Sequence, residues 1–134
     1  MANKMQSTDA SDSIFIRIGG SPAIRVLVDE FYDLIEADPA YSGVMALHGS
    51  GTADVRASLA GWLSAWLGGP KDWFEQPHPC LMGLHLSLPI TADLSAQWLQ
   101  AMRRALERGA IEPWLAAQIH QHLAKIADAM ATRR

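Results

Sequence analysis

Residues 78–90 read HPCLMGLHLSLPI and place one histidine, His85, among apolar side chains. Leucines flank it on both sides, and Pro89 ends the short helix that would carry it. A haem iron requires one neutral imidazole presented from an apolar wall. Taken alone, a histidine in such surroundings is more often an ordinary core or surface residue than an iron ligand. The stretch therefore makes His85 a candidate ligand whose assignment depends on the rest of the chain.

The hydrophobic periodicity of the chain is helical throughout. Apolar residues recur at three- and four-residue steps in four long segments. These segments are residues 21–37, 52–67, 91–108 and 112–131. Thr52 and Thr91 are predicted to cap two of the helices, and Pro113 is predicted to open the last one. No alternating strand pattern persists for more than a few residues, so the sequence predicts an all-α fold.

Two pairs of glycines punctuate this helical pattern. The pair at 19–20 follows a short helix predicted around residues 12–18, and the pair at 68–69 stands directly before Pro70. Glycine enters the left-handed backbone region without steric cost, which suits abrupt turns at helix ends. The pairs therefore predict sharp breaks that keep the fold short.

The length and composition predict one globular domain. The chain has 134 residues, of which 49% are hydrophobic and 19% are charged. This length is sufficient for one buried core. Residues 1–11 are small and polar, so we expect a flexible tail there and a single domain over 12–134. The apolar excess suits the lining of a bound porphyrin, and a surface that faces a partner would give the same excess.

Charge and cysteine content exclude several classes of partner. The net charge is −3, and the basic residues are scattered rather than aligned in a stripe, so no nucleic-acid footprint is present. No apolar run reaches the roughly 18 residues that span a bilayer, and no secretory signal is recognisable. The single Cys80 cannot form an internal disulfide. The sequence therefore predicts a cytoplasmic protein without a nucleic-acid or membrane partner.

Five short motifs occur in a characteristic order along the chain. They are Ile18-Gly19-Gly20, Phe31-Tyr32, Trp66-Leu67-Gly68-Gly69-Pro70, His78-Pro79 leading to His85, and Trp98-Leu99. Each motif is weak by itself, but the five together, in order and at these intervals, are specific. From residue 14 to 130 the chain resembles the truncated haemoglobins. It is most similar to their second group, which is marked by a tyrosine in the second helix and a tryptophan early in the penultimate one.

The resemblance implies a two-over-two helical sandwich around haem b (iron protoporphyrin IX). It makes His85 the proximal iron ligand, and it makes the Tyr32 hydroxyl and the Trp98 indole the distal hydrogen-bond donors. His48 aligns with a third distal position, where Leu47 or Met45 is the alternative. The residues expected to contact the haem are Tyr32, His48, Val55, Leu59, Trp62, Leu63, Leu81, Leu84, His85, Leu88, Trp98 and Met102.

One departure from the family pattern concerns the haem propionates. Relatives carry basic residues between the His-Pro pair and the proximal histidine, whereas this chain has Cys80, Met82 and Leu84 there. The usual propionate ion pairs are therefore in doubt, and Arg56 or Lys71 is the available substitute. Among the other tryptophans, Trp66, Trp73 and Trp114 are expected to have structural roles only.

The leading function is reversible binding of oxygen, carbon monoxide or nitric oxide at the haem iron. The alternative is a haem-dependent redox enzyme, with peroxidase-like chemistry or nitric oxide dioxygenation, which would need a reductase that the sequence does not identify. A distal site rich in donors favours slow ligand release, which suits chemistry or sensing better than oxygen transport. Two further hypotheses have less support. One is a helical interaction module without a cofactor, and the other is a metal site formed by His78, Cys80 and His85. The sequence leaves open whether the protein is a monomer or a homodimer.

Overall fold

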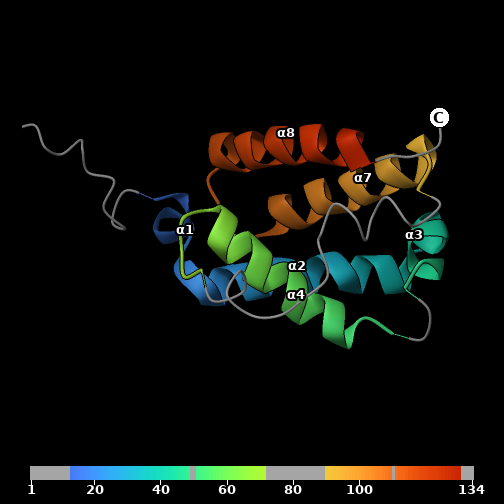
Figure 1. Ribbon diagram of the computed structural model, residues 1–134, viewed down its shortest axis with the longest axis horizontal. Coiled ribbons are helices and arrows are strands. Elements are labelled where there is room, and N and C mark those ends of the chain that lie inside the picture. Colours follow the sequence, from blue (N-terminus) through green and yellow to red (C-terminus); the bar gives the residue numbers. More distant parts are fainter. Residues whose placement is uncertain (1–12, 49–50, 72–89, 110, 131–134) are drawn as a thin grey trace, which may run out of the picture.

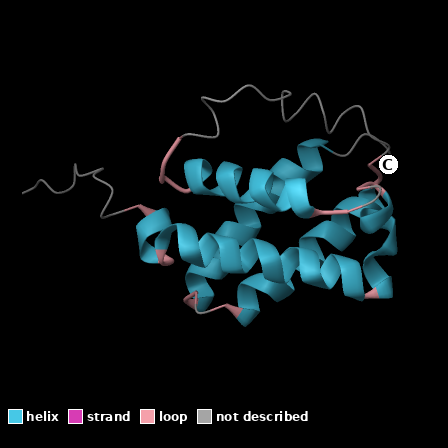
Figure 2. Cartoon of the chain, turned by 90° about the horizontal axis from the view of Figure 1, so that it is seen from below, coloured by secondary structure: helices cyan, strands magenta, loops and turns pink. Residues whose placement is uncertain are grey.

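The computed structural model describes residues 13–48, 51–71, 90–109 and 111–130, and these residues form helices joined by short turns, with no strand among them (Figures 1 and 2). In chain order the elements are α1 (Ile14–Arg17), α2 (Gly20–Ala37), the 3-10 turn η3 (Pro39–Tyr41), α3 (Ser42–Ala46), α4 (Ala53–Trp66), α7 (Ala92–Arg108) and α8 (Pro113–Met130). The predicted tail at 1–11 and the predicted helix around His85 lie outside the described residues.

The long helices form two antiparallel pairs. Helix α2 runs against α4, and α7 runs against α8 (Figure 1). Helix α2 also packs along α7, so one pair lies across the other and α2 contacts a helix of each pair. The predicted all-α fold and its two-over-two arrangement are therefore confirmed. None of the described helices combines the length and the apolar character that crossing a membrane requires.

The core follows the apolar stripe of α2. Phe31 and Val28 have no exposed surface, and Ile24 and Ile35 are each 1% exposed. Their three- and four-residue spacing puts them on one side of the helix, which faces the other layers. This orientation also carries Tyr32 inward, where it is only 4% exposed.

The glycine turns occur where the sequence predicts them. Gly19 adopts a φ of 113° between α1 and α2, and Gly68 adopts a φ of 102° just after α4. Both angles lie in the left-handed region that other residues avoid. At Gly68 a side chain would also meet Ser13, because a Cβ there would lie 2.8 Å from the Ser13 Cβ. The chain therefore reverses direction within very few residues.

The two predicted threonine caps behave differently. Thr91 caps α7 as predicted, since its Oγ1 accepts a hydrogen bond from the Leu94 backbone N–H at 3.1 Å. Thr52 stands at the N-cap position of α4, but its side chain does not cap the helix. Its hydroxyl instead donates to the Glu36 carboxylate and accepts from the Arg56 guanidinium. The predicted cap at Thr52 was wrong, because its hydroxyl is hydrogen-bonded to the charged side chains of Glu36 and Arg56.

Candidate functional site

Four aromatic rings from three parts of the chain meet in one cluster. Phe31 lies at its centre, with its ring centroid 4.7 Å from that of Tyr32 and 5.0 Å from that of Trp98. The Tyr32 ring in turn lies 5.4 Å from the His48 imidazole. All three contacts are edge-to-face, an arrangement that aromatic rings favour. The fold thus brings together the three predicted distal residues Tyr32, His48 and Trp98.

Two hydrogen-bond donors of this cluster have no partner among the described residues. The Tyr32 hydroxyl and the Trp98 indole N–H make no hydrogen bond to residues 13–48, 51–71, 90–109 or 111–130, although Tyr32 is buried and Trp98 half-buried. A polar ligand held beside Phe31 would offer a hydrogen-bond acceptor to both groups.

The Tyr32 hydroxyl remains protonated under ordinary conditions. Burial raises the pKa of Tyr32 to about 12, and the positive charge of Arg56 lowers it only in part. The Arg56 guanidinium carbon lies 5.8 Å from the centre of the Tyr32 ring. At neutral pH the phenol is therefore a donor and not an acceptor-only phenolate.

His48 is held by the backbone of α3. Its Nδ1 lies 2.9 Å from the Val44 carbonyl oxygen. A carbonyl only accepts, so Nδ1 carries the proton and the neutral ring presents a bare Nε2. Of the three predicted candidates for the third distal position, His48 is the one whose ring meets Tyr32. Met45 and Leu47 are both half-buried.

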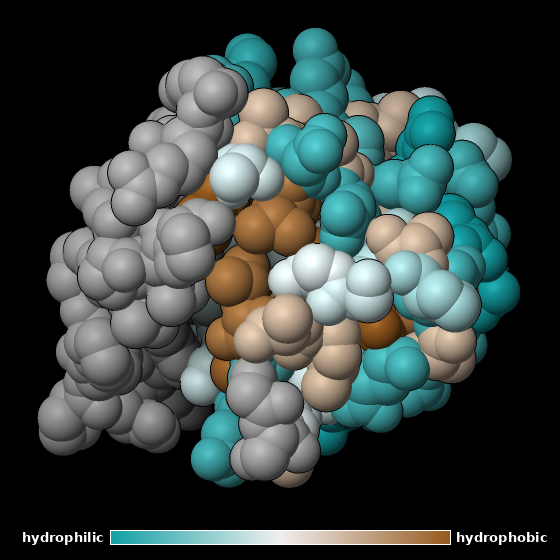
Figure 3. Space-filling view, turned by 90° about the vertical axis from the view of Figure 1, so that its right-hand side faces the viewer, coloured by the Kyte–Doolittle hydropathy of each residue, from teal (hydrophilic) through white to brown (hydrophobic). Residues whose placement is uncertain are grey.

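A close contact between α3 and α7 positions His48. A Cβ on Gly43 would lie 2.5 Å from the Leu94 side chain and 3.2 Å from the Gln97 Oε1 atom. The missing side chain of Gly43 leaves room for these two side chains of α7, and α3 lies directly against α7 here. On the side of the molecule that carries α3, apolar side chains form a band across the surface (Figure 3).

The predicted haem contacts on α4 and α7 differ in burial. Val55, Leu59 and Trp62 are half-buried and pack against the core. Leu63 and Met102 have no exposed surface at all and belong to the core itself. Half-buried apolar side chains suit the wall of a cofactor site, because they retain surface for a further contact. The haem contacts of all five stay predictions.

Residues 13–132 match the sequence model of a family described as bacterial-like globin. The chain belongs to the bacterial-like globins. Globins bind haem and small gaseous ligands, and this globin shares that general function.

Individual relatives show to which group of globins the chain is most similar. It is 30% identical over 94 residues to the group 2 truncated hemoglobin YjbI of Bacillus subtilis (strain 168), and the match covers 69% of each chain. The structure of a group II 2-on-2 hemoglobin from Agrobacterium tumefaciens is similar, with a TM-score of 0.87, 26% identity, and coverage of 95% of this chain and 99% of that one. A cold-adapted truncated hemoglobin from Pseudoalteromonas haloplanktis TAC125 gives a TM-score of 0.86 at 25% identity, over 92% and 100% of the two chains. The predicted membership of the second group of truncated haemoglobins is confirmed.

Part of the predicted site of this globin lies outside the described residues. The segment 72–89 is not described. It contains Leu81, Leu84, His85 and Leu88, as well as the departures at Cys80 and Met82 and the metal site considered at His78, Cys80 and His85. Among the residues that the structure does describe, no group of three histidine, cysteine or acidic side chains could hold a metal ion. The role of His85 therefore stays a prediction.

Arg56 clamps α4 onto α2. Its guanidinium lies 3.0 Å from the Asp29 carboxylate, 2.9 Å from that of Asp33 and 3.3 Å from that of Glu36. Its Nε also donates to the Thr52 hydroxyl at 3.0 Å. Arg56 is a candidate propionate partner by sequence, but three carboxylates of α2 already engage it. The acidic residues at 29, 33 and 36 follow a helical spacing, a signal from which this clamp could have been inferred.

The clamp alters the ionisation of its members. The hydrogen bond from Thr52, and after it those from Arg56, lower the pKa of Glu36. Burial works to raise the pKa of Asp29, but hydrogen bonds from Arg56 and Arg25 lower it overall. Burial also works to lower the pKa of Arg56, and the carboxylates of α2 raise it overall. All these groups are therefore charged at neutral pH.

We expect Arg56→Met to lower the free energy of unfolding by about 1–2 kcal/mol near neutral pH, since the arginine side chain is largely buried while its partners are partly in water. Because the pKa values of Asp29 and Glu36 are lowered in the folded state, their contribution is present above the ordinary carboxyl pKa of about 4 and is lost as the pH falls through the lowered values. The difference between the variant and the unmodified protein should therefore shrink in acid.

Urea unfolding at about pH 7 and about pH 3 measures this difference. Arg25→Gln is the control, because Arg25 is half exposed and forms an ion pair with Asp29 within one helix turn. That pair should contribute no more than about 0.5 kcal/mol. Equal losses in the two variants would show that the clamp has no special role.

Proposed function

We propose that this globin binds haem b through His85 and reversibly binds oxygen and other diatomic ligands, with Tyr32 and Trp98 as hydrogen-bond donors. The supporting observation is that both donors meet on the ring of Phe31 and lack partners among the described residues. Haem, when bound, supplies an iron atom with one open coordination position. The protein would supply the donors, the apolar surroundings and the His85 imidazole that would hold the iron.

The surroundings of the two donors favour strong hydrogen bonds. Phe31 is fully buried and Tyr32 nearly so, so water is scarce where a ligand would meet the phenol. A hydrogen bond is electrostatically stronger at low local dielectric than in water. The Tyr32 ring lies against the His48 imidazole, and no described residue accepts a hydrogen bond from the Tyr32 hydroxyl. We therefore expect slow ligand dissociation, which suits sensing or chemistry better than transport.

Retention of the haem would depend mainly on apolar contact and on His85. Arg56 is engaged by the carboxylates of α2, and the Lys71 ammonium donates to the Ala65 carbonyl at 3.4 Å. Neither cation has a clear role toward the propionates.

The single Cys80 agrees with a reducing compartment, which favours a cytoplasmic location.

A haem-dependent redox activity is the second candidate. One observation favours it, a stack of two indole rings that begins at the predicted haem contact Trp62. Peroxidase-like turnover needs an electron donor, and an aromatic stack offers a path for its electrons.

The absorption spectrum of the purified protein tests the proposed function. After reconstitution with haemin we expect an intense Soret band that shifts on reduction and shifts again when carbon monoxide is added, because an iron with one open position binds that ligand. Titration should end at one haem per chain. The absence of a Soret band would contradict the proposal. A Soret band of the reduced protein that does not shift when carbon monoxide is added would contradict it as well.

A further inference from the structure

The indole rings of Trp62 and Trp66 are stacked on α4. Their centroids lie 5.2 Å apart and their planes differ by 13°. The four-residue spacing puts both rings on one face of the helix. The Trp66 ring also forms an edge-to-face pair with the His122 imidazole of α8, with 6.5 Å between the centroids. Three rings thus lead from the predicted haem contact Trp62 to His122, which is exposed to solvent.

A cavity of about 230 Å³ opens at the far end of this row of rings. It is lined by Ile14, Trp66, Leu67, Gln118, Ile119 and His122. Leu67 and Ile119 are buried and form an apolar floor, whereas Gln118 and His122 are exposed and form a polar rim. An apolar cavity of about 150 Å³ can hold one benzene molecule, and sites for drug-sized ligands occupy roughly 300–1,000 Å³. The cavity is therefore of a size for one aromatic ring.

His122 equips the rim of the cavity with a proton acceptor. Its Nδ1 lies 2.8 Å from the Gln118 carbonyl oxygen, so Nδ1 carries the proton in the neutral ring. The other nitrogen, Nε2, then carries a lone pair that can accept a proton. A phenol loses an electron more readily when its proton can pass to a base at the same time. The cavity thus combines a base and a redox-active indole, His122 and Trp66.

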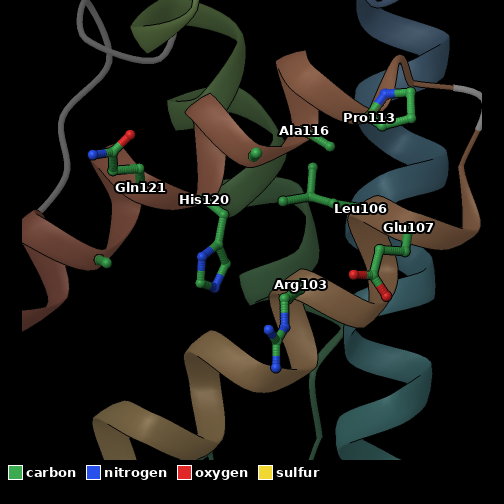
Figure 4. A pocket seen from close by; sticks show the side chains of 9 residues that line it. Arg103, Leu106, Glu107, Pro113, Ala116, His120 and Gln121 are labelled. Atoms are coloured by element: carbon green, nitrogen blue, oxygen red, sulfur yellow. The ribbon is translucent and has the colours of Figure 1, made fainter.

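A second cavity among the described residues lacks this combination. It measures about 480 Å³ and lies between α7 and α8, with Arg103, Glu107, His120 and Gln121 among its polar lining residues (Figure 4). No tryptophan or tyrosine is among the described residues that line it. The His120 Nε2 is hydrogen-bonded to the Leu99 carbonyl at 2.9 Å and is therefore not available as a base in this cavity. Of these two cavities, only the one at Trp66 connects with the row of rings.

We propose that the cavity at Trp66 binds a single-ring phenol or hydroquinone, whose electrons pass through Trp66 and Trp62 toward the haem site while a peroxide is reduced there. The inference rests on the proposed haem site beside Trp62. Hydroquinone loses two electrons and two protons and becomes a quinone. Hydrogen peroxide accepts two electrons and two protons, its O–O bond breaks, and two water molecules form. The electrons move one at a time, and His122 Nε2 takes the phenolic proton.

The first test is turnover of the haem-loaded protein with hydrogen peroxide and hydroquinone, followed by quinone absorbance. Trp66→Phe keeps an aromatic ring for packing but is much harder to oxidise, so we expect quinone formation to fall about tenfold or more. Trp66→Tyr restores an oxidisable ring and should stay within about threefold of the unmodified protein. Trp114→Phe is the matched control, because Trp114 is an exposed α8 tryptophan outside the row and should leave the rate unchanged.

Two measurements do not depend on turnover. Peroxide added without a donor should produce a tryptophanyl radical signal by electron paramagnetic resonance, and Trp66→Phe should remove most of it. Hydroquinone added without peroxide should shift the indole N–H resonance of Trp66 in the NMR spectrum more than that of Trp114. Because the second measurement uses the unmodified protein, it decides the binding claim even where Trp66→Phe fails to bind haem.

Equal quinone rates for Trp66→Phe and Trp114→Phe would overturn the inference, as would hydroquinone that leaves the Trp66 resonance unmoved. These results differ from a failure of the proposed function. A protein without a Soret band refutes haem binding itself, whereas a normal Soret band with oxidation independent of Trp66 refutes only the electron path and its cavity.

Discussion

Replacing His85 by glycine or alanine is expected to abolish axial ligation of the haem iron, which would appear as the loss of the reduced-state spectrum of a histidine-bound haem. None of the described histidines is placed to replace His85 as the iron ligand. His48 lies against Tyr32 in the distal cluster, and the His120 Nε2 is hydrogen-bonded to the Leu99 carbonyl. His122 lies on α8 and contacts Trp66.

Chemical rescue separates loss of the ligand from loss of the fold. His85→Gly should regain the ligated spectrum when free imidazole is added, because the small molecule can occupy the place of the side chain. His120→Ala is the control, and its spectrum should match that of the unmodified protein. A reduced-state spectrum that does not change in His85→Ala would mean that another residue holds the iron.

Replacing Tyr32 by phenylalanine is expected to raise the oxygen dissociation rate by roughly ten- to a hundredfold, since one strong hydrogen bond of about 1.5–3 kcal/mol is lost. The ring and its contacts with Phe31 and His48 remain, so helix content should not change. Because burial raises the pKa of Tyr32 to about 12, the hydroxyl stays protonated, and its effect should be constant across the neutral pH range.

Tyr41→Phe is the matched control for this experiment. Tyr41 is also buried, but its hydroxyl donates to Gln100 Oε1 at 3.1 Å and accepts from Arg104 at 3.0 Å. Its removal should cost stability and leave the oxygen rate unaltered. Stopped-flow displacement of oxygen measures both variants. A Tyr32→Phe rate equal to that of the unmodified protein would mean that Trp98 alone holds the ligand, and a double variant with Trp98→Phe would then carry the whole effect.

The order and type of the helices could be predicted from the sequence because they depend on local features. Three- and four-residue spacing of apolar side chains marked the stripe of α2, and glycine marked the turns at 19 and 68, where the backbone takes a positive φ. Tyr32 and Trp98 were predicted as distal residues from family resemblance, not from their spacing. They are 66 positions apart, and no local pattern indicates that both would meet the ring of Phe31.

The sequence by itself determined the helical class and the sharp turns, because each depends on near neighbours along the chain. The candidate ligands came from the family resemblance. Only the tertiary structure decided which polar groups would meet. The Thr52 hydroxyl donates to Glu36 instead of capping its helix, and Arg56 forms ion pairs with the carboxylates of α2. The tertiary structure also brought His122 of α8 against Trp66 of α4. Such contacts join residues far apart in the chain, and their partners are chosen by how the helices pack and by which charges lie within reach.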